Sequence, residues 1–217
     1  MNAKETVKRY ILFVIGLFFM GMGVAFTRHG ELGVSPISSV ANILSYKFTF
    51  WSMGEWLTFT NILLIVAQIL ILRKNFKLIQ LIQVPLSFLF GAFTDICLNM
   101  IVNIPTDTYF MRFLMVILGV VVLSFGVSLT VIANVVMNSG EAVVKAISDT
   151  INKNFGDVKI IFDVSWVAVS VVLSLIFFDF KIIGTREGTI IAAVCTGAVV
   201  KVFTKLLSPI NKLLGGN

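Results

Sequence analysis

Six long apolar runs, separated by short polar stretches, dominate the order of residues along the chain. A helix rises 1.5 Å per residue, so roughly 20 apolar residues cross the hydrocarbon core of a bilayer. The six runs approach or exceed this length, and we therefore predict an all-α membrane protein with six transmembrane helices. The runs cover residues 10–27, 56–72, 78–102, 110–136, 159–178 and 184–208.

The composition agrees with a chain that lies almost entirely in lipid. Hydrophobic residues make up 58% of the 217 positions and charged residues only 13%, and the mean hydropathy is +0.99. A soluble domain carries about 25% charged residues, so we treat residues 1–217 as one transmembrane domain. The first run ends in Arg28-His29 rather than in a small-residue cleavage site, and we expect it to remain as the first span.

Basic residues are distributed unequally between the two sides of the predicted membrane. With six spans, 12 of the 17 Lys and Arg residues lie on the side that holds both termini. Cytoplasmic connections carry an excess of Lys and Arg, so we predict cytoplasmic termini and a multi-pass protein of a bacterial inner (plasma) membrane. The net charge of +6 follows from these flanking residues, and we expect no binding of nucleic acid.

Glycine and polar positions recur in the two halves of the chain. Each half has a long run, a short polar-flanked segment and two further runs, so the second copy enters from the opposite side of the bilayer. We predict a 3+3 inverted repeat, a common plan among secondary transporters, with copies at approximately 8–104 and 109–210. The matched positions are Gly16, Gly23, Val24 and Thr27 with Gly119, Gly126, Val127 and Thr130 (a shift of 103), Gly54 and Asn61 with Gly156 and Asp163 (102), and Gly91 with Gly197 (106).

Two short segments, 35–46 and 139–151, are too short to cross a bilayer as helices. One interpretation makes them re-entrant half-helices, whose positive N-terminal ends near the midplane would bind a polar solute. The other makes them amphipathic helices on the membrane surface, with Ile37, Val40, Ala41 and Leu44 turned to lipid.

Several residues at the starts of these segments are candidates for solute binding. Ser35 is a predicted N-cap with Pro36 in the first turn, and Ser139 is the predicted cap of the second segment, before Gly140. Glu141 and Lys145 are four positions apart and are expected to pair on one helix face.

Ionisable residues inside apolar runs are costly, so they usually face a cavity or a partner. Asp163 follows Lys159 by four residues, so the two side chains share a helix face. Arg186 and Glu187 open the last span between Gly184 and Gly188. We include Asp163, Arg186 and Glu187 among the candidate substrate-binding residues, although each charged group has an ordinary alternative as a structural ion pair.

The sequence contains no catalytic or cofactor signature. His29 is the single histidine, and Cys97 and Cys195 lie inside apolar runs without metal-ligand spacing. A P-loop and a glycine-rich dinucleotide fingerprint are also absent. We therefore expect no enzyme activity, no cofactor and no metal, and any transport would be energised by a gradient or by a partner ATPase.

Several motifs together resemble the YczE/YyaS/YitT family of bacterial membrane proteins, and the resemblance extends over essentially the whole chain. It implies the same six-span fold and no established substrate residue. The motifs are Gly-Val-Ser35-Pro36-Ile-Ser-Ser-Val, Gly91-Ala-Phe-Thr-Asp95, Asn-Ser-Gly140-Glu141-Ala, Phe155-Gly156-Asp-Val-Lys159-Ile-Ile-Phe-Asp163 and Arg186-Glu187-Gly188-Thr189. A Gly-Pro-Arg-Asp type motif follows the fourth span in other relatives, where this chain has Ser-Gly-Glu.

The functional expectation is a small polar-solute transporter that works by gradient-driven alternating access between the inverted halves. One alternative is a membrane accessory protein that regulates a cytoplasmic enzyme. Another is the substrate-binding subunit of an ATP-driven importer. The expected partners are membrane lipid and a small polar solute, with a second copy of the chain or an ATPase as further candidates.

Overall fold

The computed structural model describes residues 3–213, and within them six helices are long and apolar enough to span a membrane. The described residues contain no β-strand, so the predicted all-α fold with six spanning helices is confirmed. The long helices are α1 (Ala3–His29), α3 (Met53–Leu72), α4 (Gln83–Ile101), α5 (Tyr109–Ala133), α7 (Phe155–Phe177) and α8 (Glu187–Leu206).

Shorter elements connect or extend the long helices. The half-length helices α2 (Pro36–Lys47) and α6 (Ser139–Ile151) follow α1 and α5, and α9 (Ser208–Leu213) follows α8. Two 3-10 helices, η1 (Arg73–Asn75) and η2 (Leu78–Ile82), lie between α3 and α4, and η2 continues directly into α4.

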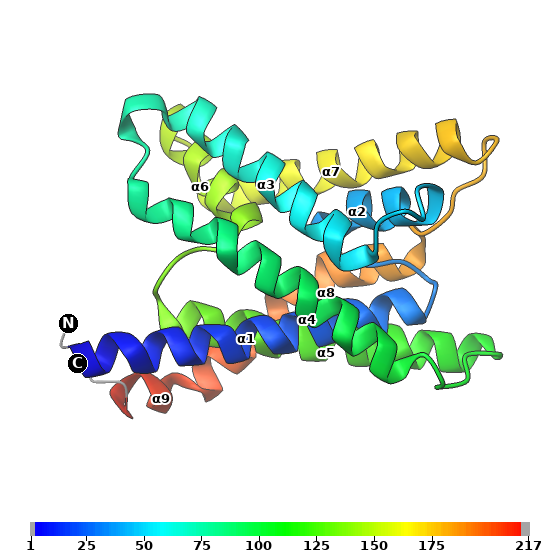
Figure 1. The fold of residues 1–217 in the computed structure, drawn as a ribbon, viewed down its shortest axis with the longest axis horizontal. Helices are drawn as coiled ribbons and strands as arrows, with labels where there is room; N and C mark the ends of the chain where they lie inside the picture. The colour runs from blue at the N-terminus through cyan, green and yellow to red at the C-terminus, as the bar shows by residue number, and fades with distance from the viewer. Residues whose placement is uncertain (1–2, 214–217) are drawn as a thin grey trace.

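The long helices run between two ends of the molecule (Figure 1). We call the end where α1 begins and α8 ends the terminal face, and the other end the opposite face. The connection of residues 73–77 also lies at the terminal face, as expected from an even number of spans between it and each chain end. Which face is cytoplasmic stays a prediction from the charge distribution.

Helices α1 and α5 are antiparallel and form the centre of the fold because glycines let their backbones approach closely. A Cβ at Gly126 would lie 2.5 Å from the Met20 nitrogen, and a Cβ at Gly23 would lie 2.5 Å from the Leu123 nitrogen. Gly16 contacts Thr130, and Gly119 contacts Thr27 in the same way. The recurrent residues of the two halves therefore contact one another across this crossing.

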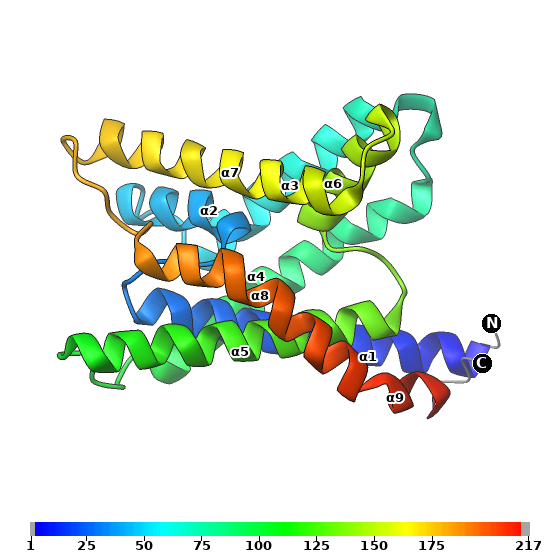
Figure 2. The same cartoon turned by 180° about the vertical axis from the view of Figure 1, so that it is seen from behind.

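The other helices surround this pair in two groups (Figures 1 and 2). Helix α4 packs on α1 as α8 packs on α5, while α2 lies against α3 and α7, and α6 against the same two helices. Helices α3 and α7 begin 102 positions apart, and a side-chain oxygen caps the start of each helix. Ser52 accepts from the Glu55 nitrogen (3.0 Å), and Asn154 accepts from the Gly156 nitrogen (2.8 Å). That the two complete halves superpose on each other as an inverted repeat stays a prediction.

Candidate functional site

A cavity of about 750 Å³ lies between the α1–α5 pair and the group that contains α2, α3, α6 and α7. Each of the helices α1 to α8 contributes to its wall. Met20, Asn61 and Leu123 border it from the central parts of α1, α3 and α5, so the cavity reaches the middle of the bundle. Most of its lining is apolar, with a small number of polar side chains, which is typical of small-molecule sites.

The first turns of α2 and α6 meet at this cavity. Ser35, Pro36 and Ile37 line it from α2, and Gly140 lines it from α6. Gly140 lies so close to the Ile37 side chain that a Cβ at position 140 would overlap it. The indole nitrogen of Trp166 donates to the Ile37 carbonyl at 3.0 Å and holds the start of α2 against α7.

Each short helix then runs from the cavity toward a different face of the molecule. Helix α2 ends beside the opposite face, where Lys47 donates to the Phe177 carbonyl at the end of α7 (3.1 Å). Helix α6 ends just before α7 begins at the terminal face. Val40 and Ala41, which the surface-helix interpretation turns to lipid, are buried against protein. This burial disagrees with surface helices that turn these residues to lipid, and it favours the interpretation as re-entrant half-helices.

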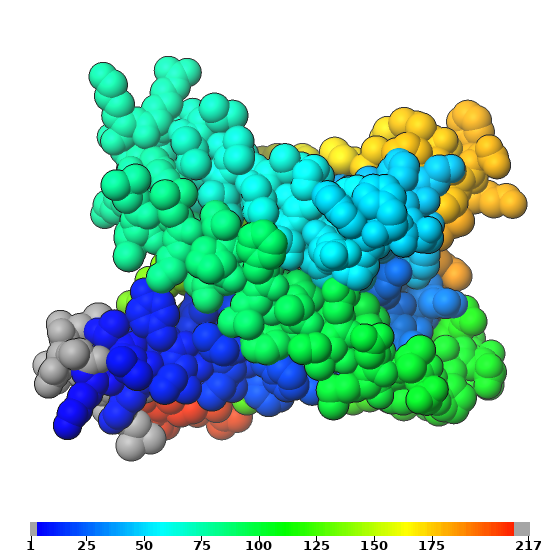
Figure 3. Space-filling model, viewed as in Figure 1, coloured from blue at the N-terminus to red at the C-terminus, as the bar shows by residue number. Residues whose placement is uncertain are grey.

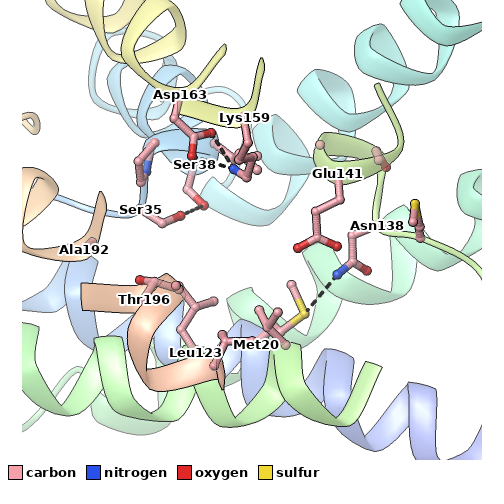
Figure 4. A pocket seen from close by; sticks show the side chains of 18 of the residues that line it. Met20, Ser35, Ser38, Leu123, Asn138, Glu141, Lys159, Asp163, Ala192 and Thr196 are labelled. Atoms are coloured by element: carbon pink, nitrogen blue, oxygen red, sulfur yellow. Dashed lines mark hydrogen bonds and ion pairs between the residues drawn. The ribbon is translucent and has the colours of Figure 1, made fainter. Parts of the chain in front are cut away.

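Glu141 points from the first turn of α6 into the cavity, beside Asn138 (Figure 4). Among the described residues, no Lys, Arg or His side chain lies within the 4.0 Å of an ion pair from its carboxylate. Burial raises the pKa of the Glu141 carboxyl, and the charge of Asp163 raises it further, while Lys159 and the Asn138 hydrogen bond act in the opposite direction. Glu141 is therefore a carboxyl group that borders the cavity without an ion-pair partner among the described residues.

The predicted pair of Lys159 and Asp163 is confirmed on the α7 wall of the cavity. The Lys159 Nζ atom lies 2.6 Å from both carboxylate oxygens of Asp163, so the two charges largely cancel (Figure 4). Ser35 and Ser38 hydrogen-bond to each other on the neighbouring α2 wall, with their hydroxyl oxygens 2.9 Å apart. Of the two carboxylates that line the cavity, Glu141 is consequently the one without an adjacent basic partner among the described residues.

The expected pairing of Glu141 with Lys145 is wrong. Lys145 is exposed and pairs with Asp149 at 2.6 Å, because its position on α6 faces away from the cavity that Glu141 enters. Ser139 is also not the cap of α6. It is the first helical residue, Asn138 occupies the cap position, and neither makes a side-chain capping hydrogen bond. Ser35 does occupy the cap position of α2, although its hydroxyl bonds to Ser38 instead of to the backbone.

The structure brings together six of the nine candidate binding residues and places the other three elsewhere. Arg186 and Glu187 lie near the opposite face, where they pair at 3.3 Å and Tyr109 donates to Glu187 at 3.2 Å. Lys145, as described above, faces outward. The six residues that line the cavity are Ser35, Pro36, Ser139, Gly140, Glu141 and Asp163.

Other polar residues of the cavity, among them Asn138 and Lys201, were missed because their sequence context is ordinary. Asn138 donates to the Met20 sulfur at 3.5 Å from the position before α6. Lys201 lines the cavity from α8, but in the sequence it reads as a membrane-flanking basic residue. The repeat does offer a signal for it, since the shift of 106 that matches Gly91 with Gly197 also matches Asp95 with Lys201.

The cavity is closed toward the opposite face and extends toward the terminal face. Its lining ends at Val24 on α1 and at Ser38 on α2. Beyond these positions, Arg28 donates to Asn42 and to Ser45 (2.8 Å) and ties α1 to α2. On α7 and α8, by contrast, the lining reaches the last turns before the terminal face. Among residues 3–213, no group of His, Cys, Asp and Glu side chains is arranged to hold a metal ion.

Comparisons with known proteins agree with the predicted resemblance. Residues 7–205 match the model of a family described as a family of unknown function (DUF6198). The chain belongs to this family. It is also 25% identical over 200 residues to the uncharacterized membrane protein YczE of Bacillus subtilis (strain 168), an alignment that covers 91% of this chain and 86% of that protein. The YczE-like family and a membrane location are thus shown, and no solved structure matches the chain.

Proposed function

We propose that this protein is a transporter that moves a small polar solute across the bacterial inner membrane by alternating access. The observation that carries the proposal is the convergence of the α2 and α6 N-termini on a cavity at the middle of the bundle. Broken or half-length helices whose N-termini meet at the midplane are the common construction of substrate sites in secondary transporters. An accessory protein that acts only through its surface would not need such a cavity.

The chemistry of the cavity selects a class of solute. Glu141 offers a carboxylate without an adjacent base, and Asn138 offers an amide beside it. Apolar side chains, among them Phe13, Leu57 and Phe90, form much of the remaining wall. A solute with one cationic or hydrogen-bond-donating group and an apolar body fits this combination.

Glu141 also supplies a route for coupling to a gradient. A carboxyl group with a raised pKa can be protonated when the cavity is empty and deprotonated when a cation is bound. Exchange of one proton for one cationic solute would then let the proton gradient drive transport without ATP. In this proposal the terminal face is cytoplasmic, because it carries the excess of Lys and Arg.

The test compares Glu141→Gln with Asp149→Asn, a matched carboxyl-to-amide change on the exposed side of the same helix. Purified protein is screened for ligand-induced thermal stabilisation against a panel of small organic amines and neutral analogues, and active compounds are then measured for uptake into proteoliposomes. We expect wild type and Asp149→Asn to respond to the same amines and Glu141→Gln to lose both stabilisation and uptake. Amine binding to wild type should strengthen as pH rises through the raised pKa of Glu141, since the deprotonated form binds the cation.

Three results would overturn or replace the proposal. Equal stabilisation of all three proteins by every active compound would exclude Glu141 from the site. Uptake that requires a co-purified ATPase would instead assign the chain to the substrate-binding subunit of an importer. If no solute is bound and a cytoplasmic enzyme co-purifies with the protein, the accessory role replaces the transporter.

A further inference from the structure

Helices α3 and α4 close the bundle near the opposite face by a glycine contact. Gly54 and Gly91 lie so close that a Cβ on either residue would overlap the backbone of the other. The Gly54 nitrogen donates to the Asp95 carboxylate at 2.8 Å, and the Thr58 hydroxyl donates to the Ser87 carbonyl at 3.2 Å. On the surface seen in Figure 3, side chains of α3 and α4 form a continuous wall where the two helices cross.

The equivalent glycines of the second half, Gly156 on α7 and Gly197 on α8, do not touch. A Cβ at Gly197 would meet no atom within 4 Å, and one at Gly156 would meet only its own N-cap Asn154 at 3.3 Å. Helices α7 and α8 diverge toward the terminal face (Figure 2). Gly156 and Gly197 both line the cavity, so the space between α7 and α8 is the open side of the site.

We propose that α7 and α8 are the gate of the terminal face and that a second conformation brings Gly156 against Gly197, as Gly54 lies against Gly91 here. This inference rests on the proposed alternating access, because a carrier needs a state in which the terminal face is closed and the opposite face open. The structure has the reverse arrangement, because Gly54 lies against Gly91 while a Cβ at Gly197 would meet no atom within 4 Å.

The charges at the two contacts support this pairing. The shift that relates Gly91 to Gly197 relates Asp95, which accepts from the start of α3, to Lys201. A lysine cannot accept a hydrogen bond from the start of α7. Asp157 in the first turn of α7 supplies the opposite charge, and both Asp157 and Lys201 are exposed in this conformation. Closure would therefore bring together Asp157 and Lys201.

The packing partner that fits the open surface of α7 is α8 of the same chain. The glycine on α8 and the glycine on α7 border one cavity of one chain. They also occupy the positions at which the first half already makes an intramolecular crossing. A second copy of the chain would instead have to insert a helix between α7 and α8, and in doing so would fill the site.

Disulfide trapping tests the gate in the full-length protein, with Cys97 and Cys195 replaced by alanine. The pair Gly156→Cys and Lys201→Cys copies Gly54 and Asp95, where a Cβ on residue 54 would lie 2.7 Å from the Asp95 Cγ atom, which places the two thiols within disulfide range in the closed state. The control pair is Gly156→Cys with Val202→Cys, since Val202 is adjacent to Lys201 but points away, with 65% of its surface exposed. Oxidation is carried out in proteoliposomes, without added solute and with the amine that stabilises the wild type.

We expect an intramolecular disulfide in the first pair and not in the control, with loss of solute uptake on oxidation and recovery on reduction. Gly197→Leu should also abolish uptake while leaving thermal stability close to that of wild type, because a Cβ at Gly197 would meet no atom within 4 Å in the present conformation.

Three results overturn or separate the claims. A disulfide that forms only between two chains, seen as a dimer on a non-reducing gel, would make α7 and α8 an intermolecular interface. No intramolecular disulfide in a protein that still shows Glu141-dependent uptake would remove the gate and leave the proposed function intact. A trapped disulfide in a protein that binds and carries no solute would keep the closing motion and refute the transporter.

Discussion

The close backbone approach between α1 and α5 makes Gly126→Ala a stringent test of how the fold is held together. The added Cβ would lie 2.5 Å from the Met20 nitrogen and 2.7 Å from the Gly16 carbonyl oxygen. It is thus about 0.9 Å short of the 3.4 Å at which ordinary contact begins. Neither neighbour is the end of a flexible side chain, so the strain is relieved only when the two central helices move apart.

The expected magnitude follows from two opposing effects. Overpacking of a tight interior costs about 1–3 kcal/mol, while alanine favours a helix over glycine by about 1 kcal/mol. Both clashing neighbours are backbone atoms, so we take the upper part of that packing range, about 2–3 kcal/mol. We therefore expect Gly126→Ala to lower the free energy of unfolding by about 1–2 kcal/mol. Gly23→Ala should have a similar effect, because its Cβ would meet the Leu123 nitrogen at the same 2.5 Å.

The matched control is Gly197→Ala on α8, where the Cβ would meet nothing within 4 Å. The packing penalty is absent there, so this variant should be as stable as wild type or slightly more stable. Thermal unfolding in detergent, followed by tryptophan fluorescence, measures all three variants. An unchanged Tm for Gly126→Ala, or an equal loss in Gly197→Ala, would refute the assignment of these glycines to close and open positions.

Two further predictions concern the topology and the buried amides. Lys74→Cys should react with a membrane-impermeant maleimide only from the cytoplasmic side, and Asp107→Cys only from outside, because both residues are exposed and lie at opposite faces. Labelling of Lys74→Cys in intact cells would show that the topology is inverted. Gln68 and Gln83 are buried and exchange two hydrogen bonds of 3.2 Å, so Gln68→Leu should cost about 1–3 kcal/mol by leaving the Gln83 amide without its partner. The double variant with Gln83→Leu should recover part of that loss in thermal unfolding; a double variant with the summed destabilisation would show that the two amides act independently.

The pattern of residues along the chain was enough to predict the spanning helices. A lipid-facing segment must satisfy all of its backbone hydrogen bonds internally, so a run of about 20 apolar residues has little choice but to be a helix. The same local reasoning predicted the Lys159–Asp163 pair, because residues four apart on a helix are neighbours whatever surrounds them. The recurrent glycines predict a repeat, and only the packed structure shows that they meet across the α1–α5 crossing.

The composition of the candidate site was decided by tertiary packing. Glu141 has Lys145 one turn away and was expected to pair with it, yet α6 is oriented so that Glu141 enters a cavity and Lys145 does not. Spacing along one helix cannot say which face meets a distant helix, since that depends on contacts made by residues far apart in sequence. For the same reason Arg186 and Glu187 looked like site residues and lie near the opposite face, while Lys201 looked like a flanking charge and lines the cavity. The sequence by itself determined which segments are helical and which positions allow close approach. Only the packed structure decided that Gly54 meets Gly91 while Gly156 and Gly197 stay apart. The physical reason is that equivalent local sequences can occupy two arrangements of the same helices.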